Sequence, residues 1–364
     1  MAGIYVHIPF CKTRCLYCGF YSTTRHEWRQ RYVDAICKEW QLRRNNIDVP
    51  VRTIYIGGGT PSQLMSDELE QLFHAIGSAE EVTIECNPDD VTPSFASLLS
   101  QLPVNRVSMG AQTFGDERLK FIGRRHNSSQ IQVAVERLRD VGIGNISIDL
   151  MYGFPNETLA EWHYDIDCAL ALGVEHLSAY ALMFEEGTPL YRLLEQGRVK
   201  EVDEEVSRQM YYELIDRLVA AGYEHYEISN FAKRGFRAVH NSNYWNQTPY
   251  IGLGAAAHSF DGKRRQWNID DVEQYMEGVE SGLLHYDYED LDGDAHYNDV
   301  VMTALRTCEG LDLSLLSDTQ WDYCIQQARR YLDDGLLIQE KDHLRLSRRG
   351  LFVSDMIMCD LMRA

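Results

Sequence analysis

The sequence contains no hydrophobic run long enough to cross a membrane. Hydrophobic residues make up 45% of its 364 residues, yet no segment approaches the ~20 consecutive apolar residues of a spanning helix. The first residues, Met1-Ala-Gly-Ile4, include no basic stretch leading into an apolar core, which a secretory signal requires. We therefore expect a cytoplasmic protein, in a compartment that keeps cysteines reduced and favours metal ligands over disulfides.

Positive charge is also scarce. The chain has 35 Lys and Arg against 55 Asp and Glu, so its formal net charge is −20. Such a surface repels polyanions, so we expect no nucleic-acid partner. Three short basic clusters, at residues 233–234, 263–265 and 348–349, are predicted to be solvated surface.

Cysteines are concentrated in one place. Cys11, Cys15 and Cys18 lie within eight residues, and no second C-x2-C pair occurs elsewhere. A structural zinc site needs four N or S ligands. His7 or His26 could supply the fourth, so zinc stays open, as does a disulfide. A [4Fe–4S] cluster is normally held by four cysteines. Three would leave one iron free to bind a small molecule, and we favour this interpretation.

Strand-like and helix-like segments alternate along the first two thirds of the chain. This alternation predicts βαβ units and a parallel sheet. Six such units are too few for a closed eight-fold barrel, so we predict an α/β fold with a partial (β/α)6 barrel through about residue 230. The expected strands are 4–8, 53–56, 82–86, 106–109, 145–150 and 176–182, and the expected helices are 28–43, 67–76, 129–141, 159–172 and 204–221.

The pattern changes after the predicted barrel. We predict three domains: the barrel over residues 1–235, a connecting segment over 236–294, and a C-terminal domain over 295–364. The acidic stretch 285–294 is predicted to be a linker. The last segment shows a helix, helix, small hairpin, helix order, which is typical of a winged-helix-like domain. Because the chain is acidic, we expect this domain to act as an interface or lid and not to bind DNA.

Polar residues and glycines follow the ends of successive predicted strands. Residues 57–61, Gly-Gly-Gly-Thr-Pro, come after the second strand, Glu85 ends the third, Gln112 follows the fourth and Asp149 ends the fifth. The cysteines follow the first. Ligands of parallel α/β sheets gather at the carboxyl ends of the strands. We therefore predict a binding site at this edge.

The motifs at 5–18, 57–61, 108–112 and 149–155 together resemble the radical S-adenosylmethionine (SAM) superfamily. More narrowly, they resemble the branch of oxygen-independent coproporphyrinogen III dehydrogenase, HemN, and the heme chaperones, HemW. The resemblance runs nearly the full length. It implies that Cys11, Cys15 and Cys18 hold a [4Fe–4S] cluster and that SAM chelates the open iron. The residues that it implies for SAM binding are Tyr5, Tyr17, Gly58, Gly59, Thr60, Glu85, Gln112, Arg124 and Asp149. For Arg124, an ordinary surface arginine is the alternative.

Two departures separate this chain from the dehydrogenase pattern. That pattern has a fourth cysteine two residues after the third, where this chain has Phe20, and a longer extension before its first strand. Both differences resemble the chaperones, as does the H-N-x-x-Y motif, His240-Asn241-x2-Tyr244, which is associated with heme binding in that group. His240 and Tyr244 are therefore candidate heme ligands, because imidazole and tyrosinate both serve as axial ligands. A hydrogen-bonded histidine in a packed loop is the alternative for His240.

The resemblance favours a heme chaperone that binds the cluster, SAM and heme and transfers heme to acceptor hemoproteins. On this hypothesis no residue is assigned a catalytic role. The alternatives are oxidative decarboxylation of coproporphyrinogen III and another radical-SAM modification of heme. An electron donor such as flavodoxin or ferredoxin is an expected partner. Homodimerisation and peripheral membrane contact stay open.

Overall fold

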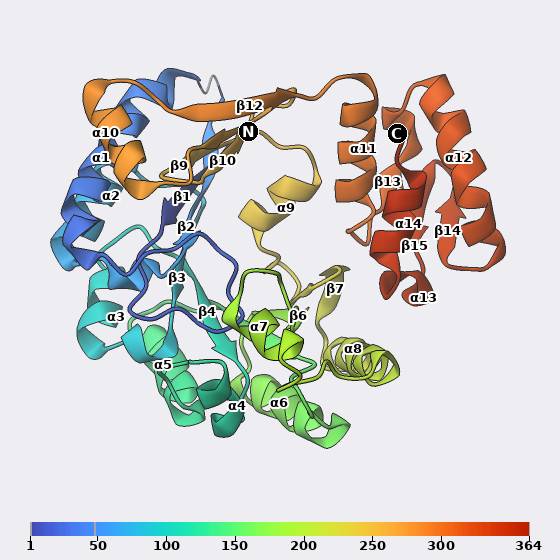
Figure 1. Cartoon of the computed structure of the whole chain (residues 1–364), viewed down its shortest axis with the longest axis horizontal. Helices are drawn as coiled ribbons and strands as arrows, with labels where there is room; N and C mark the ends of the chain where they lie inside the picture. The colour runs from blue at the N-terminus through green and yellow to red at the C-terminus, as the bar shows by residue number, and fades with distance from the viewer. Residues whose placement is uncertain (1, 47–48, 364) are drawn as a thin grey trace.

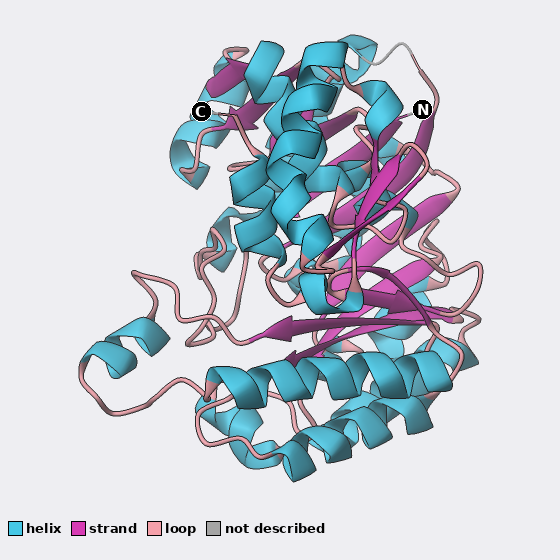
Figure 2. Ribbon diagram, turned by 90° about the vertical axis from the view of Figure 1, so that its right-hand side faces the viewer, coloured by secondary structure: helices cyan, strands magenta, loops and turns pink. Residues whose placement is uncertain are grey.

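A single twelve-stranded sheet forms the centre of the molecule in the computed structural model, which describes residues 2–46 and 49–363. Its strand order is β12-β11-β10-β9-β1-β2-β3-β4-β5-β6-β8-β7. The strands from β9 through β6 in this order are parallel, and the flanking strands pair antiparallel. The helices run along the outside of the sheet (Figures 1 and 2). This is the predicted partial barrel.

The elements follow one another in a regular alternation through the barrel. The strands are β1 (Ala2–Ile8), β2 (Val51–Gly58), β3 (Glu81–Cys86), β4 (Arg106–Gln112), β5 (Asn145–Tyr152), β6 (His176–Ala181), β7 (Glu224–Glu227), β8 (Asn230–Ala232), β9 (Tyr250–Leu253), β10 (His258–Phe260), β11 (Arg264–Asn268) and β12 (Tyr286–Asp290). The helices are α1 (Arg29–Arg43), α2 (Ser66–Ile76), α3 (Pro93–Leu99), α4 (Asp116–Phe121), α5 (Ser128–Asp140), α6 (Leu159–Leu172), α7 (Pro189–Glu195), α8 (Glu204–Ala220), α9 (Val239–Trp245) and α10 (Val272–Ser281).

The barrel strands are apolar on one face and polar on the other. In β1, Ile4, Val6 and Ile8 are fully buried in the main core, and Tyr5 and His7 alternate with them. Successive side chains of a strand point to opposite faces. The apolar face therefore packs against the helices, and the polar face turns into the barrel. This alternation supplies the polar side chains of the site described below.

All six predicted barrel strands and all five predicted helices are present, with some boundaries longer and some shorter than predicted by one to three residues. The predicted linker 285–294 is wrong in part. It contains β12, which pairs antiparallel with β11 at the edge of the sheet. Every residue of β12 is exposed. Charged side chains are typical of edge strands, where they discourage pairing with other chains, and this composition concealed the strand.

The C-terminal region has its own core and a three-stranded sheet in the order β13-β15-β14. Its elements are α11 (Gly293–Ala304), β13 (Leu311–Asp312), α12 (Asp318–Asp333), β14 (Leu337–Glu340), β15 (His343–Leu346), α13 (Arg348–Leu351) and α14 (Ser354–Leu361). The predicted hairpin is β14–β15, and the short strand β13 was not predicted. Figure 1 shows this region at one side of the barrel, with α9 between the sheet and α11.

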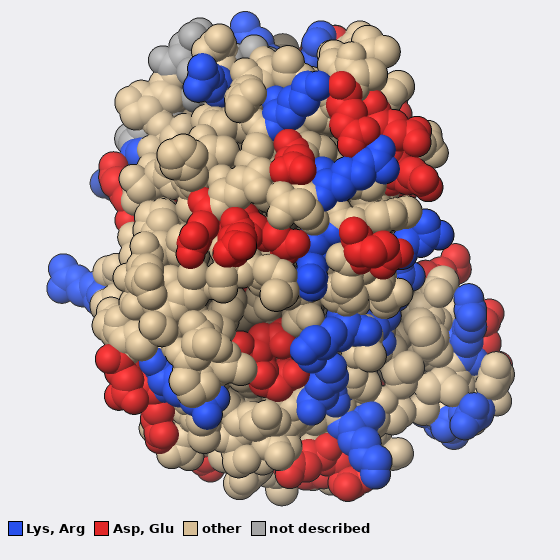
Figure 3. Space-filling model, turned by 90° about the vertical axis from the view of Figure 1, so that its left-hand side faces the viewer, with Lys and Arg blue, Asp and Glu red and all other residues tan. Residues whose placement is uncertain are grey.

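Acidic and basic side chains lie beside one another on the face shown in Figure 3. Members of the predicted basic clusters are paired within the chain. Arg264 Nε lies 2.6 Å from Asp290 Oδ1, and Lys233 Nζ lies 3.6 Å from Glu175 Oε1. Over residues 2–46 and 49–363, no helix combines the length and the apolar character that crossing a membrane would need.

Candidate functional site

A cavity of about 570 Å³ opens at the carboxyl ends of the barrel strands. It brings together residues from loops that are far apart in the sequence. Of the residues predicted for the cluster and for SAM, those that line it are Cys11, Cys15, Cys18, Tyr17, Gly58, Gly59, Thr60, Glu85, Gln112, Arg124 and Asp149. Tyr5 is not among the lining residues. Its ring stacks on that of Tyr55, with a centroid distance of 6.2 Å, and Tyr55 lines the cavity.

The cysteine loop follows β1 and is closed by backbone hydrogen bonds. The Cys11 N–H donates to Thr23 O at 2.9 Å, and the Thr23 N–H donates to Pro9 O at 2.7 Å. All the described cysteines are free thiols, so the disulfide alternative is not formed. Burial raises the pKa of the Cys11 and Cys18 thiols.

The loop fits an iron–sulfur cluster. Its three thiols face one cavity, and Arg124 Nη1 lies 3.8 Å from Cys15 Sγ, where its charge would stabilise a thiolate. Within the described ranges, no three His, Cys, Asp or Glu side chains are grouped to hold a single metal ion. A [4Fe–4S] cluster does not need three side chains around one metal ion, because each cysteine ligates a separate iron.

Glycines allow the turn after β2 to approach its neighbours closely. Gly58 has φ +111°, a left-handed conformation that favours glycine. A Cβ on Gly57 would lie 2.9 Å from Glu85 Oε1, and one on Gly59 would lie 2.8 Å from the Pro9 carbonyl carbon. Glycines therefore let this turn pack closely on Glu85 and Pro9, and Gly58 and Gly59 line the cavity.

Two half-buried carboxyl groups, those of Glu85 and Asp149, line the cavity. Glu85 Oε1 accepts a hydrogen bond from the Tyr55 hydroxyl at 2.7 Å, and Oε2 accepts one from the Gly58 N–H at 3.1 Å. Burial raises the pKa of Glu85 to about 7 and that of Asp149 to about 6. A cationic ligand would favour ionisation of both groups. The ammonium and sulfonium charges of SAM suit these partners.

Arg124 is not an ordinary surface arginine. Its Nη2 donates to Asn87 Oδ1 at 2.5 Å and to Gly110 O at 2.6 Å, and within the described residues its buried Nε has no hydrogen-bond partner. Gln112 has φ +68°, which is uncommon for a non-glycine residue and tends to occur at functional sites. It lies where the register between β4 and β5 shifts.

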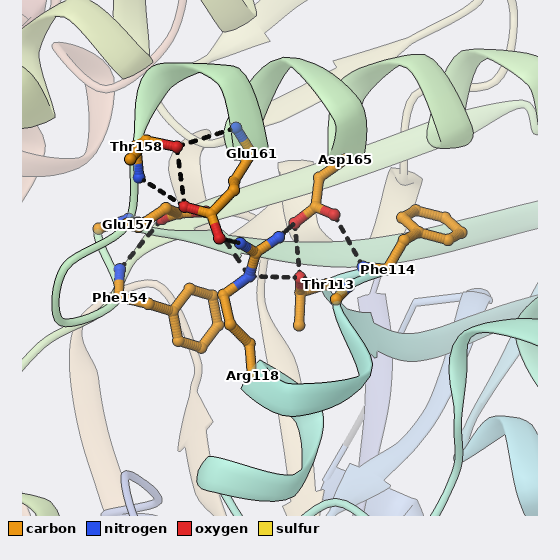
Figure 4. Close-up of polar contacts among 10 residues, drawn as sticks. Thr113, Phe114, Arg118, Phe154, Glu157, Thr158, Glu161 and Asp165 are labelled. Atoms are coloured by element: carbon orange, nitrogen blue, oxygen red, sulfur yellow. Dashed lines mark hydrogen bonds and ion pairs between the residues drawn. The ribbon is translucent and has the colours of Figure 1, made fainter.

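A polar network fixes the loop that follows β4 (Figure 4). Arg118 Nη2 lies 3.1 Å from Asp165 Oδ2, and Nη1 lies 3.2 Å from Glu161 Oε1. Asp165 also accepts hydrogen bonds from the Thr113 hydroxyl at 2.6 Å and from the Phe114 N–H at 2.9 Å. The network joins this loop to α6. It therefore holds the end of β4, which supplies part of the cavity wall.

The two candidate heme ligands lie together but outside the cavity lining. His240 is 1% exposed. Its Nδ1 lies 2.9 Å from Thr53 Oγ1, and its Nε2 lies 2.9 Å from the Tyr244 hydroxyl. Burial, helped by the charge of Arg106, lowers the pKa of His240 to about 3, so the imidazole is neutral. In this conformation His240 is a hydrogen-bonded histidine in a packed environment.

Several cavity residues were not predicted from the sequence. They include Tyr55, Asn87, Ser108, Ser178, Tyr180 and Asn241. The rule that ligands gather at strand ends could have found Asn87, directly after β3, and Tyr180, near the end of β6. Asn241 belongs to the H-N-x-x-Y motif, but nothing in the motif places it at the cavity, because only packing brings α9 there.

Comparison with known proteins places this arrangement in a family. Residues 5–169 match the Radical SAM superfamily, and residues 291–353 match the HemN C-terminal domain. The fold superimposes on the structure of coproporphyrinogen III oxidase (HemN) from Escherichia coli with a TM-score of 0.84, over 99% of this chain and 90% of that chain. The sequence identity is 22%, so this likeness shows a shared fold.

Two relatives of higher identity are named heme chaperones. The chain is 35% identical to the heme chaperone HemW of Bacillus subtilis (strain 168), over 85% of each chain. It is 33% identical to HemW of Mycobacterium tuberculosis (strain ATCC 25618 / H37Rv), over 99% of this chain and 94% of that protein. With this cavity, this fold and these relatives, the chain belongs to the radical SAM superfamily and, within it, to the HemW family.

Proposed function

We propose that the protein is a heme chaperone that binds a [4Fe–4S] cluster, SAM and heme, and passes the heme to acceptor hemoproteins. The observation that carries the proposal is the cavity itself, in which the three-cysteine loop faces Glu85 and Asp149. Phe20, which stands where the dehydrogenase pattern has a fourth cysteine, lines the same cavity and is 75% exposed. The similarity to HemW relatives over most of the chain supports a chaperone over a dehydrogenase.

In this proposal the cavity residues divide into two groups. Cys11, Cys15 and Cys18 hold the cluster, which supplies an iron without a protein ligand for the amino and carboxylate groups of SAM. Glu85 and Asp149 accept hydrogen bonds from ribose hydroxyls and offset the positive charge of SAM. An electron donor such as flavodoxin or ferredoxin would reduce the cluster.

Heme binding needs surface that is apolar, flat and close to a neutral imidazole. Phe20, Tyr180 and Met183 line the cavity and are exposed, and their apolar surface suits contact with a porphyrin face. Arg14 also lines the mouth, where it can pair with a propionate. His240 is the proposed axial ligand, with Tyr244 beside it. Because His240 Nε2 is hydrogen-bonded to Tyr244, ligation requires α9 to move.

The second candidate function is oxidative decarboxylation of coproporphyrinogen III. The observation in its favour is the superposition of the whole fold on the Escherichia coli enzyme. Anaerobic incubation with coproporphyrinogen III, SAM and reductant tests it directly. Formation of protoporphyrinogen at more than one turnover per chain would replace the chaperone proposal with this one.

The chaperone proposal is tested by an anaerobic hemin titration of the cluster-reconstituted protein, followed by absorption. We expect saturation near one heme per chain. The His240→Ala variant should show an altered spectrum and weaker binding with its iron–sulfur content intact. His225→Ala is the control, because His225 is a half-buried imidazole, hydrogen-bonded to Ile228 O at 3.2 Å, and does not line the cavity.

The outcomes test the chaperone proposal and the role of His240 separately. Absence of saturable binding by the intact protein would refute the chaperone proposal. Normal binding with an unchanged spectrum in His240→Ala would remove His240 as the axial ligand. Equal losses of heme affinity in His240→Ala and His225→Ala would mean that the loss follows from removing any packed imidazole. This result would also exclude His240 as the axial ligand.

A further inference from the structure

Helix α9, which carries the H-N-x-x-Y motif, touches both the cavity and the C-terminal region. Asn241 lines the cavity, although its neighbour His240 does not. The first N–H groups of the helix are held by Glu81, whose carboxylate accepts from the Val239 N–H at 2.9 Å and from the His240 N–H at 2.8 Å. One end of α9 is therefore anchored to the barrel beside β3.

A second connection runs through the barrel interior. The Tyr55 hydroxyl donates to Glu85 Oε1 at 2.7 Å, and the Tyr55 ring stacks on the His240 ring with a centroid distance of 5.2 Å and an interplanar angle of 28°. One tyrosine thus contacts a cavity carboxylate at its hydroxyl and the motif histidine at its ring face.

The histidine has little room to move independently of Tyr55. Thr53 and Tyr244 hold its two ring nitrogens at 2.9 Å each. On another side, a Cβ added to Gly3 would lie 3.1 Å from His240 Cε1, so the ring packs against bare backbone. Closely packed groups transmit displacements to one another. A shift of the Tyr55 ring is therefore passed to His240.

The other end of α9 combines hydrogen bonds to α11 with buried polar atoms that lack a partner in the described part of the chain. Gln247, just beyond the helix, has φ +60° and donates through Nε2 to Asp299 Oδ2 and to Thr303 Oγ1, both at 2.9 Å. Within the described residues, the buried atoms Trp245 Nε1, Gln247 Oε1 and Arg306 Nε have no hydrogen-bond partner. Unsatisfied buried groups and strained backbone both cost free energy. A second arrangement of this end would recover part of that cost.

We propose that α9 couples the cavity to the heme ligand, so that SAM bound in the cavity strengthens heme binding at His240. Asn241 contacts the cavity ligand directly. A ligand hydroxyl or ammonium on Glu85 competes with the Tyr55 hydroxyl for the carboxylate, and release of Tyr55 loosens the packing that keeps Nε2 on Tyr244. This inference rests on the proposed heme chaperone function and deepens it.

Coupling of this kind is reciprocal: heme must strengthen SAM binding by the same factor. Typical coupling between two sites changes affinity by about 5- to 150-fold. We therefore expect at least about a fivefold decrease in the heme dissociation constant when the cavity is saturated with SAM.

The test measures heme dissociation constants of the full-length, cluster-loaded protein with and without saturating SAM. The cluster is kept oxidised, so that SAM stays intact. Tyr55→Phe removes the hydroxyl and keeps the ring, and Asn241→Ala removes the direct contact. The control is Tyr223→Phe, which removes another buried hydroxyl, one that donates to Val174 O at 2.5 Å outside the cavity.

We expect the SAM effect on heme affinity to fall below twofold in Tyr55→Phe, to weaken in Asn241→Ala and to persist in Tyr223→Phe. The reverse measurement, SAM affinity with and without heme, should give the same factors. An unchanged factor in both cavity variants would overturn this inference. If the wild-type heme dissociation constant is the same with and without SAM, the coupling is overturned and the proposed function is not. Absence of heme binding would overturn the proposed function as well.

Discussion

The raised pKa of Glu85 predicts that this residue lowers the stability of the ligand-free protein at neutral pH and favours the binding of a cationic ligand. Its carboxyl is held in the cavity with its pKa raised from the ordinary value of 4.5 to about 7 by burial. A pKa raised from 4.5 to about 7 corresponds to about 3 kcal/mol of preference for the neutral form. The ligand-free folded state therefore loses stability relative to the unfolded state as the pH rises from 4.5 through 7.

The variant Glu85→Gln removes this titration and nearly keeps the shape. Its amide oxygen can still accept from the Gly58 N–H, and its amide nitrogen can donate to the Tyr55 oxygen, because a hydroxyl both donates and accepts. Between pH 5.5 and 8, linkage predicts that the wild type loses ~2 kcal/mol of unfolding free energy more than Glu85→Gln does. Any pH-independent effect of the substitution cancels in this difference.

The measurement is urea unfolding of both full-length proteins without ligand, at the two pH values. Tryptophan fluorescence is a suitable signal because Trp162 of α6 is fully buried in the barrel core. As a control, Glu80→Gln changes an exposed carboxylate and should leave the difference near zero. If the wild type and Glu85→Gln change in parallel between pH 5.5 and 8, Glu85 does not titrate with a raised pKa and the reasoning fails.

Three further predictions concern binding, cluster assembly and the network of Figure 4. Since a cationic ligand favours ionised Glu85, SAM affinity in equilibrium dialysis should rise about tenfold between pH 6 and 8 in the wild type and little in Glu85→Gln; equal slopes would point to another group. Cys18→Ser should lose most of its iron and sulfide after anaerobic reconstitution, whereas Cys37→Ser should not; full iron content in Cys18→Ser would contradict its role as a ligand. Asp165→Ala should lower the unfolding free energy by about 1–3 kcal/mol, because it leaves the Thr113 hydroxyl and the Phe114 N–H without their acceptor, while Arg118 keeps Glu161; a loss well below about 1 kcal/mol in urea unfolding would show that these donors find other partners.

Features that depend on neighbouring residues could be predicted from the sequence. Short strand-like runs between helix-like segments predicted the barrel strands, because β-branched and aromatic residues favour strands. The cysteine spacing and the glycine turn identified two walls of the cavity, because both lie in continuous segments next to strand ends. The acidic strand β12 escaped prediction, since an exposed edge strand has no apolar face to reveal it.

Contacts between distant segments were decided only by the tertiary structure. The sequence could assign Arg124 to a surface or to a cavity, and packing of the loop after α4 placed it 3.8 Å from Cys15. The sequence identified His240 as a candidate ligand, but it did not predict the hydrogen bonds of its ring nitrogens to Thr53 and Tyr244. The sequence by itself thus determined the barrel strands, the cysteine loop and the family resemblance, because these are read from local pattern. The tertiary structure alone brought α9 to the cavity and Tyr55 between Glu85 and His240, because the contacts of a packed interior depend on all the segments that meet there.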